Sequence, residues 1–128
     1  MYSEKVMEHF KHPRHFGEIK DAEGVGVAGN IQCGDVMQVF IKVKNNKVVD
    51  AKFKTYGCAA AISASDALCE LVKGKTIQAA SKITREDIVK FLEGLPLIKI
   101  HCSVLGIETL HEAIKNYKAK KLKKNKNV

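Results

Sequence analysis

The sequence predicts an α+β domain in which helices pack on one face of a small three-stranded antiparallel sheet. Two observations indicate this class. One helical segment and three strand-like segments occupy roughly the first half of the chain, and every later segment has helical periodicity. The length of 128 residues suits one such domain, and an apolar fraction of 45% is typical of a globular protein.

The first predicted helix covers residues 3–10, with Ser3 as its N-cap. Val6, Met7 and Phe10 lie on one side of it, and the sequence His-Pro-Arg at 12–14 ends it. A glycine-rich segment follows, in which Val25 and Val27 alternate as in a short strand. We therefore predict a short strand within this glycine-rich segment.

Two further strands form a predicted hairpin around residues 45–47. A three-residue loop there pairs residues whose numbers sum to 92, which sets Ile41 opposite Ala51 and Val39 opposite Phe53. A two-residue loop shifts the pairing by one and mixes apolar with charged side chains, so the apolar pattern favours the longer loop. The same ladder sets Gly34 opposite Cys58, with Cys33 beside that end of the sheet.

The segment from Ala59 to a stop at Gly74 has the periodicity of a helix. Its apolar stripe consists of Ile62, Ser65, Cys69 and Val72. A short helix is predicted at 76–81, and Thr84 with Asp87 forms a capping pair for a helix that reaches about residue 93. The last predicted helix covers about 102–117, with an apolar stripe of Ile107, Leu110, Ile114 and Tyr117.

The net charge of +8 is concentrated at the end of the chain. Residues 118–128 hold six lysines and no acidic residue, whereas residues 1–117 are close to neutral. We therefore expect a folded domain over 1–117 and a disordered, solvated lysine-rich tail over 118–128. The folded part lacks a basic surface with interleaved aromatic residues, so a nucleic-acid partner is not expected.

The chain is expected to be cytoplasmic and to have no membrane partner. Its N-terminus lacks the apolar stretch of a signal peptide, and no apolar run approaches the roughly 20 residues that cross a bilayer. The four cysteines at 33, 58, 69 and 102 should then be reduced, which favours metal binding or thiol chemistry over disulfides.

Three of the cysteines occupy junctions between predicted elements. Cys33 lies in a loop, Cys58 lies between a strand and a helix, and Cys102 lies near the start of the last helix. A helix N-terminus favours the thiolate form, which is both the metal ligand and the nucleophile. Cys69 lies in the middle of an apolar helix stripe, so we expect it to pack in the core.

Asp35 and His101 are further candidate ligands because each is next to or near a junction cysteine. A solvated or capping role is the alternative for Asp35, and a structural role is the alternative for His101. Three cysteines with His or Asp suit zinc, iron or an iron–sulfur cluster, and spacing does not distinguish these.

The remaining histidines give weaker signals. His9, His12 and His15 cluster near the N-terminus, where a solvated surface is favoured over a three-histidine site. His111 is expected to be exposed on the last helix.

Several motifs together resemble one family. They are the opening YSEKV with HPR at 12–14, NIQCGD at 30–35, YGC at 56–58 and HCSVL at 101–105. In this order they resemble the IscU/NifU N-domain family of iron–sulfur cluster assembly scaffolds. The His-Cys pair, and the lack of a long insertion between Cys58 and Cys102, resemble the IscU/NifU branch more than the zinc-dependent SufU branch.

The resemblance implies a scaffold, not a conventional enzyme, that builds a transient 2Fe–2S cluster from iron and persulfide sulfur. It implies a cysteine desulfurase as the sulfur donor, with Cys102 as the first acceptor. Cys33, Cys58 and Cys102 would hold the cluster, with His101 or Asp35 as the fourth ligand, and zinc could occupy the same site. The alternative function is a zinc-binding structural or interaction module.

The resemblance also implies partners. These are apo-ferredoxin-type acceptors, a DnaK-type chaperone pair and a frataxin-type protein, with the chain as a monomer or a cluster-bridged homo-oligomer. The family usually has Pro where Leu97 stands, in the segment that such chaperones bind in relatives, and it usually differs at Ile31 and Ala59 as well.

Overall fold

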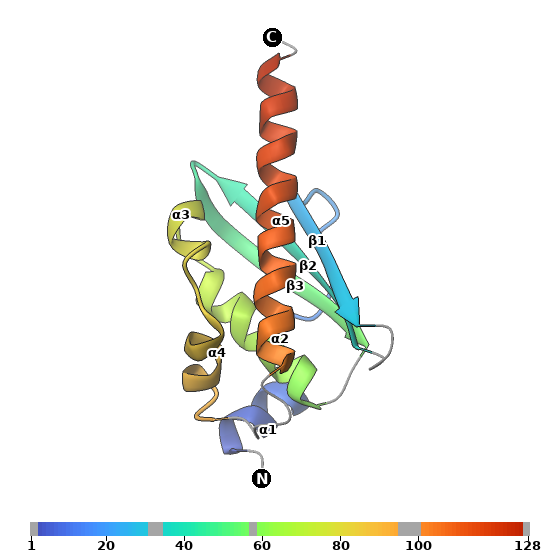
Figure 1. Cartoon of the computed structure of the whole chain (residues 1–128), viewed down its shortest axis with the longest axis vertical. Helices are drawn as coiled ribbons and strands as arrows, with labels where there is room; N and C mark the ends of the chain where they lie inside the picture. Colours follow the sequence, from blue (N-terminus) through green and yellow to red (C-terminus); the bar gives the residue numbers. More distant parts are fainter. Residues whose placement is uncertain (1–2, 31–34, 57–58, 95–100, 127–128) are drawn as a thin grey trace.

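The computed structural model describes residues 3–30, 35–56, 59–94 and 101–126. The elements are, in chain order, α1 (Glu4–Lys11), β1 (Gly24–Asn30), β2 (Asp35–Lys44), β3 (Lys47–Tyr56), α2 (Ala59–Val72), α3 (Ile77–Ala80), α4 (Arg85–Phe91) and α5 (His101–Lys126). The three strands form an antiparallel sheet in the order β1-β2-β3. Helices α2 and α5 cover one face of this sheet, which confirms the predicted fold class (Figure 1).

Three of the predicted helices begin at a capping residue, and the sequence predicts two of these caps, at Ser3 and at Thr84 with Asp87. The Ser3 hydroxyl accepts a hydrogen bond from the Val6 amide at the start of α1. Thr76 caps α3, and Thr84 with Asp87 forms a reciprocal capping box at the start of α4. These side chains satisfy amides that the first helical turn leaves without a partner.

The β2–β3 hairpin differs from the prediction at its turn. Asn45 and Asn46 both have positive φ angles, of 53° and 65°, so the loop has two residues and not three. Val43 therefore pairs with Val48. An irregularity between Lys42 and Val43 then restores the predicted register for the rest of the ladder.

The irregularity between Lys42 and Val43 is a β-bulge, and it reconciles two sequence signals that disagreed about the hairpin. The Asn-Asn turn favours a two-residue loop, and the apolar pattern favours the register in which Ile41 pairs with Ala51 and Val39 with Phe53. One extra residue in the ladder satisfies both. It also buries Val48 and leaves Val49 43% exposed.

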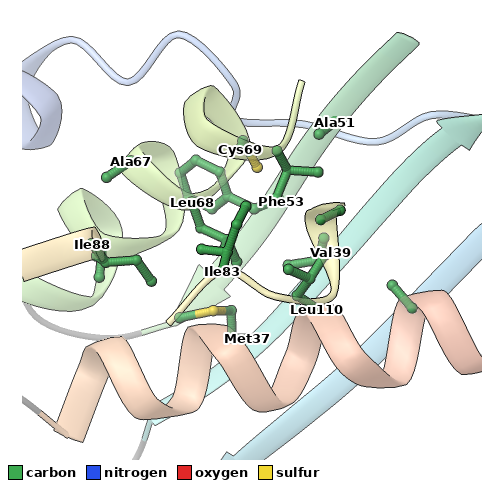
Figure 2. Packing of buried hydrophobic residues seen from close by; sticks show 14 of the residues in the cluster. Met37, Val39, Ala51, Phe53, Ala67, Leu68, Cys69, Ile83, Ile88 and Leu110 are labelled. Carbon is green, nitrogen blue, oxygen red and sulfur yellow. The ribbon is translucent and has the colours of Figure 1, made fainter. Parts of the chain in front are cut away.

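The core lies between the sheet and the helices. Met37, Val39 and Phe53 point from the sheet toward Leu68 of α2 and Leu110 of α5, and all five are buried (Figure 2). Cys69 is also fully buried in this cluster, as predicted. Burying a large apolar side chain contributes about 1.5–3 kcal/mol, so this layer holds α2 and α5 firmly on the sheet.

Strand β1 packs against α5 through glycines. A Cβ atom on Gly26 would lie 2.2 Å from the Thr109 carbonyl oxygen, and one on Gly24 would lie 2.4 Å from the Ala113 carbonyl oxygen. Real Cβ atoms do not approach backbone that closely, so only glycine permits this contact. Val27 lies on the other face of β1 and is 56% exposed.

The segment after α1 runs along the outer edge of β3. The Phe53 amide donates to the His15 carbonyl at 2.9 Å, and the Gly17 amide donates to the Phe53 carbonyl at 2.8 Å. Beyond it, Glu18 pairs with Lys54 and Asp21 pairs with Lys42. These contacts carry the chain from the β3 edge back toward β1.

Helix α5 is longer than predicted. It continues to Lys126, so residues 118–126 are helical where we expected a disordered tail. Lysine, alanine and leucine all favour helix, and the continuous helix adds one backbone hydrogen bond per residue once it has begun. Among the helices that the structure describes, none has the length and apolarity that spanning a bilayer requires.

Candidate cysteine site at one end of the sheet

The predicted site is defined by three junctions of the chain. Cys33 and Cys58 lie outside the described residues, and only the elements on either side of them are described here. Asp35 is the first residue of β2, and His101 and Cys102 are the first two residues of α5.

Strand pairing brings the first two junctions together. Asn30 pairs with Asp35, so the segment that contains Cys33 joins two adjacent strand ends. Val36 pairs with Tyr56, and Cys58 follows Tyr56 by two residues. The predicted ladder therefore persists to its last described pair, and the strand ends that flank both cysteines in the sequence lie at the same end of the sheet. The Gly34–Cys58 pair itself lies outside the described residues.

Packing brings the start of α5 to the same end. Gly24 lies against Ala113 and Gly26 lies against Thr109, so moving along β1 toward Asn30 moves along α5 toward His101. Farther along in that direction, Met37 of β2 lies near Gly106. Figure 1 shows α5 beginning at the same end of the sheet at which β3 ends and α2 begins.

Two helices begin at or next to predicted site cysteines. Cys58 directly precedes α2, and Cys102 lies in the first turn of α5. The unpaired amides at a helix N-terminus carry a partial positive charge, which stabilises a thiolate there. Thiolates are the form of cysteine that ligates a soft metal or a cluster and that accepts sulfur.

Cys69 has the opposite environment. Burial raises the pKa of its thiol well above the ordinary value, and the negative charges of Asp66, Asp50 and Glu70 raise it further. It therefore stays a neutral thiol packed in the core, as predicted from its place in the helix stripe.

The N-terminal histidines differ from the prediction of a solvated surface. His9 and His15 are each only 8% exposed. The fully buried carboxylate of Asp66 bonds the His9 ring through Nδ1 and accepts the His15 backbone amide at 2.9 Å. His15 Nε2 lies 2.6 Å from Glu70 Oε2, and this hydrogen bond is the main cause of a lowered pKa for Glu70.

The sequence contains a signal for this group of buried histidines and their carboxylate partners. Asp66 stands in a helix of alanine, serine and apolar residues, and Glu70 follows it by one helical turn. A buried carboxylate needs hydrogen-bond donors, and the nearby histidine-rich segment supplies them. His12 is exposed, and within the described ranges the side chains form no group of three or more residues that could hold a metal ion.

His111 is exposed on α5, as predicted. Its Nε2 lies 3.3 Å from the Ser81 carbonyl oxygen, beside the end of α3. It is well along α5 from the first turn that carries His101 and Cys102.

The fold and the site define a class of small α+β domains that present cysteine-bearing junctions at one end of a three-stranded sheet. The family model of the NifU-like N terminal domain matches residues 1–124. The chain belongs to this family.

Curated relatives agree with this assignment. The chain is 53% identical over 117 residues to the iron–sulfur cluster assembly scaffold protein IscU 1 of Archaeoglobus fulgidus, which covers 91% of this chain and 76% of the relative. It is also 53% identical, over 118 residues, to the iron–sulfur cluster assembly scaffold protein IscU of Aquifex aeolicus, with coverages of 91% and 75%.

A solved structure supports the fold. The crystal structure of the N-terminal part of a nitrogen-fixing NifU-like protein from Brucella abortus superposes with a TM-score of 0.73. The superposition covers 92% of this chain and 94% of that one, at 18% identity.

Proposed function

We propose that this protein is a scaffold on which iron–sulfur clusters are assembled and from which they are transferred to other proteins. The observation that carries the proposal is the convergence of three cysteine-bearing junctions at one end of the sheet. The names of relatives that are 53% identical support the same role. A scaffold needs ligands that are accessible at an end of the fold and not enclosed in its core, and the proposal assigns that role to these junctions.

Cys33, Cys58 and Cys102 are the proposed ligands of a transient 2Fe–2S cluster, which is the cargo of the protein. Sulfur would arrive from a cysteine desulfurase. The Cys102 thiolate attacks the outer sulfur of the persulfide on the donor, a new S–S bond forms, and the donor cysteine leaves as a thiolate. An external electron donor then supplies the two electrons that convert the transferred sulfur to sulfide.

Asp35 or His101 is the proposed fourth ligand, because each begins an element at the cysteine end. An oxygen or nitrogen donor should hold a cluster less firmly than a fourth thiolate, which suits a protein that releases its product. Zinc could bind the same ligands tetrahedrally. Apo-ferredoxin-type proteins are the proposed acceptors, and a DnaK-type chaperone pair and a frataxin-type protein are proposed partners.

Anaerobic reconstitution tests the ligand assignment. The chain is incubated with iron, cysteine, a reductant and a cysteine desulfurase, and visible absorption follows cluster formation. Cys33→Ala, Cys58→Ala and Cys102→Ala should each abolish or strongly reduce the chromophore. Cys69→Ala is the matched control, because this buried neutral thiol should leave cluster yield unchanged while costing about 1 kcal/mol of stability.

Cluster formation that survives all three junction substitutions would contradict the assignment of these cysteines as cluster ligands. A wild-type chain that binds zinc but forms no chromophore under these conditions would instead favour the zinc-binding module.

The fourth ligand is tested by the lifetime of the cluster. Asp35→Ala should give a longer-lived cluster during transfer to an apo-ferredoxin, because it removes a weak oxygen donor whose exchange assists release. Absorption at fixed intervals after adding the acceptor measures this lifetime. An unchanged or faster loss would count against Asp35 in that role, and the same measurement on His101→Ala then examines the histidine.

A further inference from the structure

A basic pocket lies between the C-terminal end of α2, α3 and α4. It has a volume of about 440 Å³ and is open to solvent on one side. Leu71, Ile83 and Phe91 provide apolar lining, and Ile83 is buried while the other two are half-buried. Lys75, Lys82 and Lys90 complete its wall together with Ala79 and Asp87.

The pocket carries an excess of positive charge. Within the part of the chain that the structure describes, none of the three lysines forms an ion pair. The one carboxylate in the lining is Asp87, and its Oδ2 accepts the Thr84 amide at 2.9 Å in the capping box. The lining therefore combines three lysines with apolar side chains and a single carboxylate, one oxygen of which is already engaged.

The lysines are held at fixed points although their side chains are exposed. The Lys75 amide donates to Val72 and its carbonyl accepts the Val48 amide at 2.8 Å, which ties it to β3. The Lys82 amide donates to Ala79, and Lys90 lies in the last turn of α4. The backbone positions from which the three lysine side chains extend are thus fixed by the fold.

We propose that this pocket binds an acidic segment of a partner protein, in which an apolar side chain is flanked by aspartate or glutamate. The apolar lining receives the apolar side chain, and the ammonium groups pair with the flanking carboxylates. An exposed ion pair contributes little by itself, so a ligand that engages all three lysines and the apolar surface together is favoured over a small free anion. The three lysines lack the forked geometry with which arginine grips a phosphate.

The α2 side of the pocket is distant from the cysteine end. Cys58 directly precedes α2, whereas Leu71 lies in the last turn of this 14-residue helix. The two ends of such a helix are about 20 Å apart. Figure 1 shows α3 and α4 on one side of α5 and strand β1 on the other. A partner could therefore stay bound here while the cysteine end is occupied, and the proposal holds whether or not the protein is a cluster scaffold.

Chemical-shift mapping on the isotope-labelled full chain tests the proposal. The probe is a synthetic peptide Glu-Asp-Leu-Phe-Glu-Asp, and the reference is its neutral counterpart Gln-Asn-Leu-Phe-Gln-Asn. We expect the acidic peptide to shift the amides of Ala79, Ile83 and Phe91, with an affinity that falls as salt rises. The triple variant Lys75→Gln, Lys82→Gln, Lys90→Gln should bind about tenfold more weakly.

The matched control removes three other exposed lysines: Lys20→Gln, Lys44→Gln, Lys115→Gln. It has the same net charge as the pocket variant and should bind the acidic peptide as the wild type does. The proposal is overturned if the neutral peptide shifts the same amides equally, if the shifts are confined to the lysines of 118–126, or if both triple variants lose affinity alike.

Discussion

Asp66 connects the N-terminal segment of the chain to the helix that follows the cysteine end. Its carboxylate is fully buried and is bonded by the His9 ring and by the His15 amide. These two partners lie on α1 and on the segment that borders β3, so one side chain holds two separate parts of the N-terminal segment against α2. A buried carboxylate with satisfied partners specifies one arrangement of its neighbours.

Removing this carboxylate should destabilise the fold. Asp66→Ala leaves a buried amide and a buried ring nitrogen without partners, and we expect a loss of about 3 kcal/mol. Urea unfolding followed by circular dichroism measures it. Ser65→Ala is the matched control, because Ser65 is equally buried but bonds only the Ala61 carbonyl of its own helix. A loss for Asp66→Ala no larger than for Ser65→Ala would contradict the proposed role.

The close packing of strand β1 against helix α5 positions the start of α5. Glycines at 24 and 26 let the strand approach the helix backbone, which brings the first turn of α5 level with the end of the sheet. The glycine-rich segment suggested a strand but not this contact, because a sequence pattern does not show which element a glycine faces. The bulged hairpin could not be predicted for a related reason, since two local signals disagreed by one residue.

A side chain on Gly26 should separate β1 from α5. Gly26→Ala places a Cβ atom within 2.4 Å of backbone atoms of Thr109 and Ala113, and we expect a loss of about 3 kcal/mol in the free energy of unfolding. Gly106→Ala, in helix α5, is the control, because a Cβ atom there would meet only ordinary contacts at 3.6 Å or more. The helix propensity of alanine should make that variant neutral or more stable. Thermal unfolding compares the two, and equal stability would contradict the close contact.

At the scale of the whole molecule, the fold brings the elements that flank the predicted site cysteines to one end of the sheet. A basic pocket lies between α2, α3 and α4. The register argument that brought Cys33 and Cys58 together from alternating apolar residues holds to the last described pair of the ladder. The contribution of α5 could not be derived in that way, because helix-to-sheet packing depends on contacts between residues far apart in sequence. The buried histidines were missed for the same reason, since their carboxylate partners follow by more than 50 residues.

The central claim is that an iron–sulfur cluster is assembled at the cysteine end and then transferred to another protein. The most direct measurement is transfer from the reconstituted chain to an apo-ferredoxin in the presence of a chelator that traps free iron, followed by circular dichroism in the visible range. The account predicts that the acceptor spectrum grows as the scaffold spectrum declines, despite the chelator. An acceptor that stays apo, or that matures equally well from iron and sulfide without this chain, would contradict it.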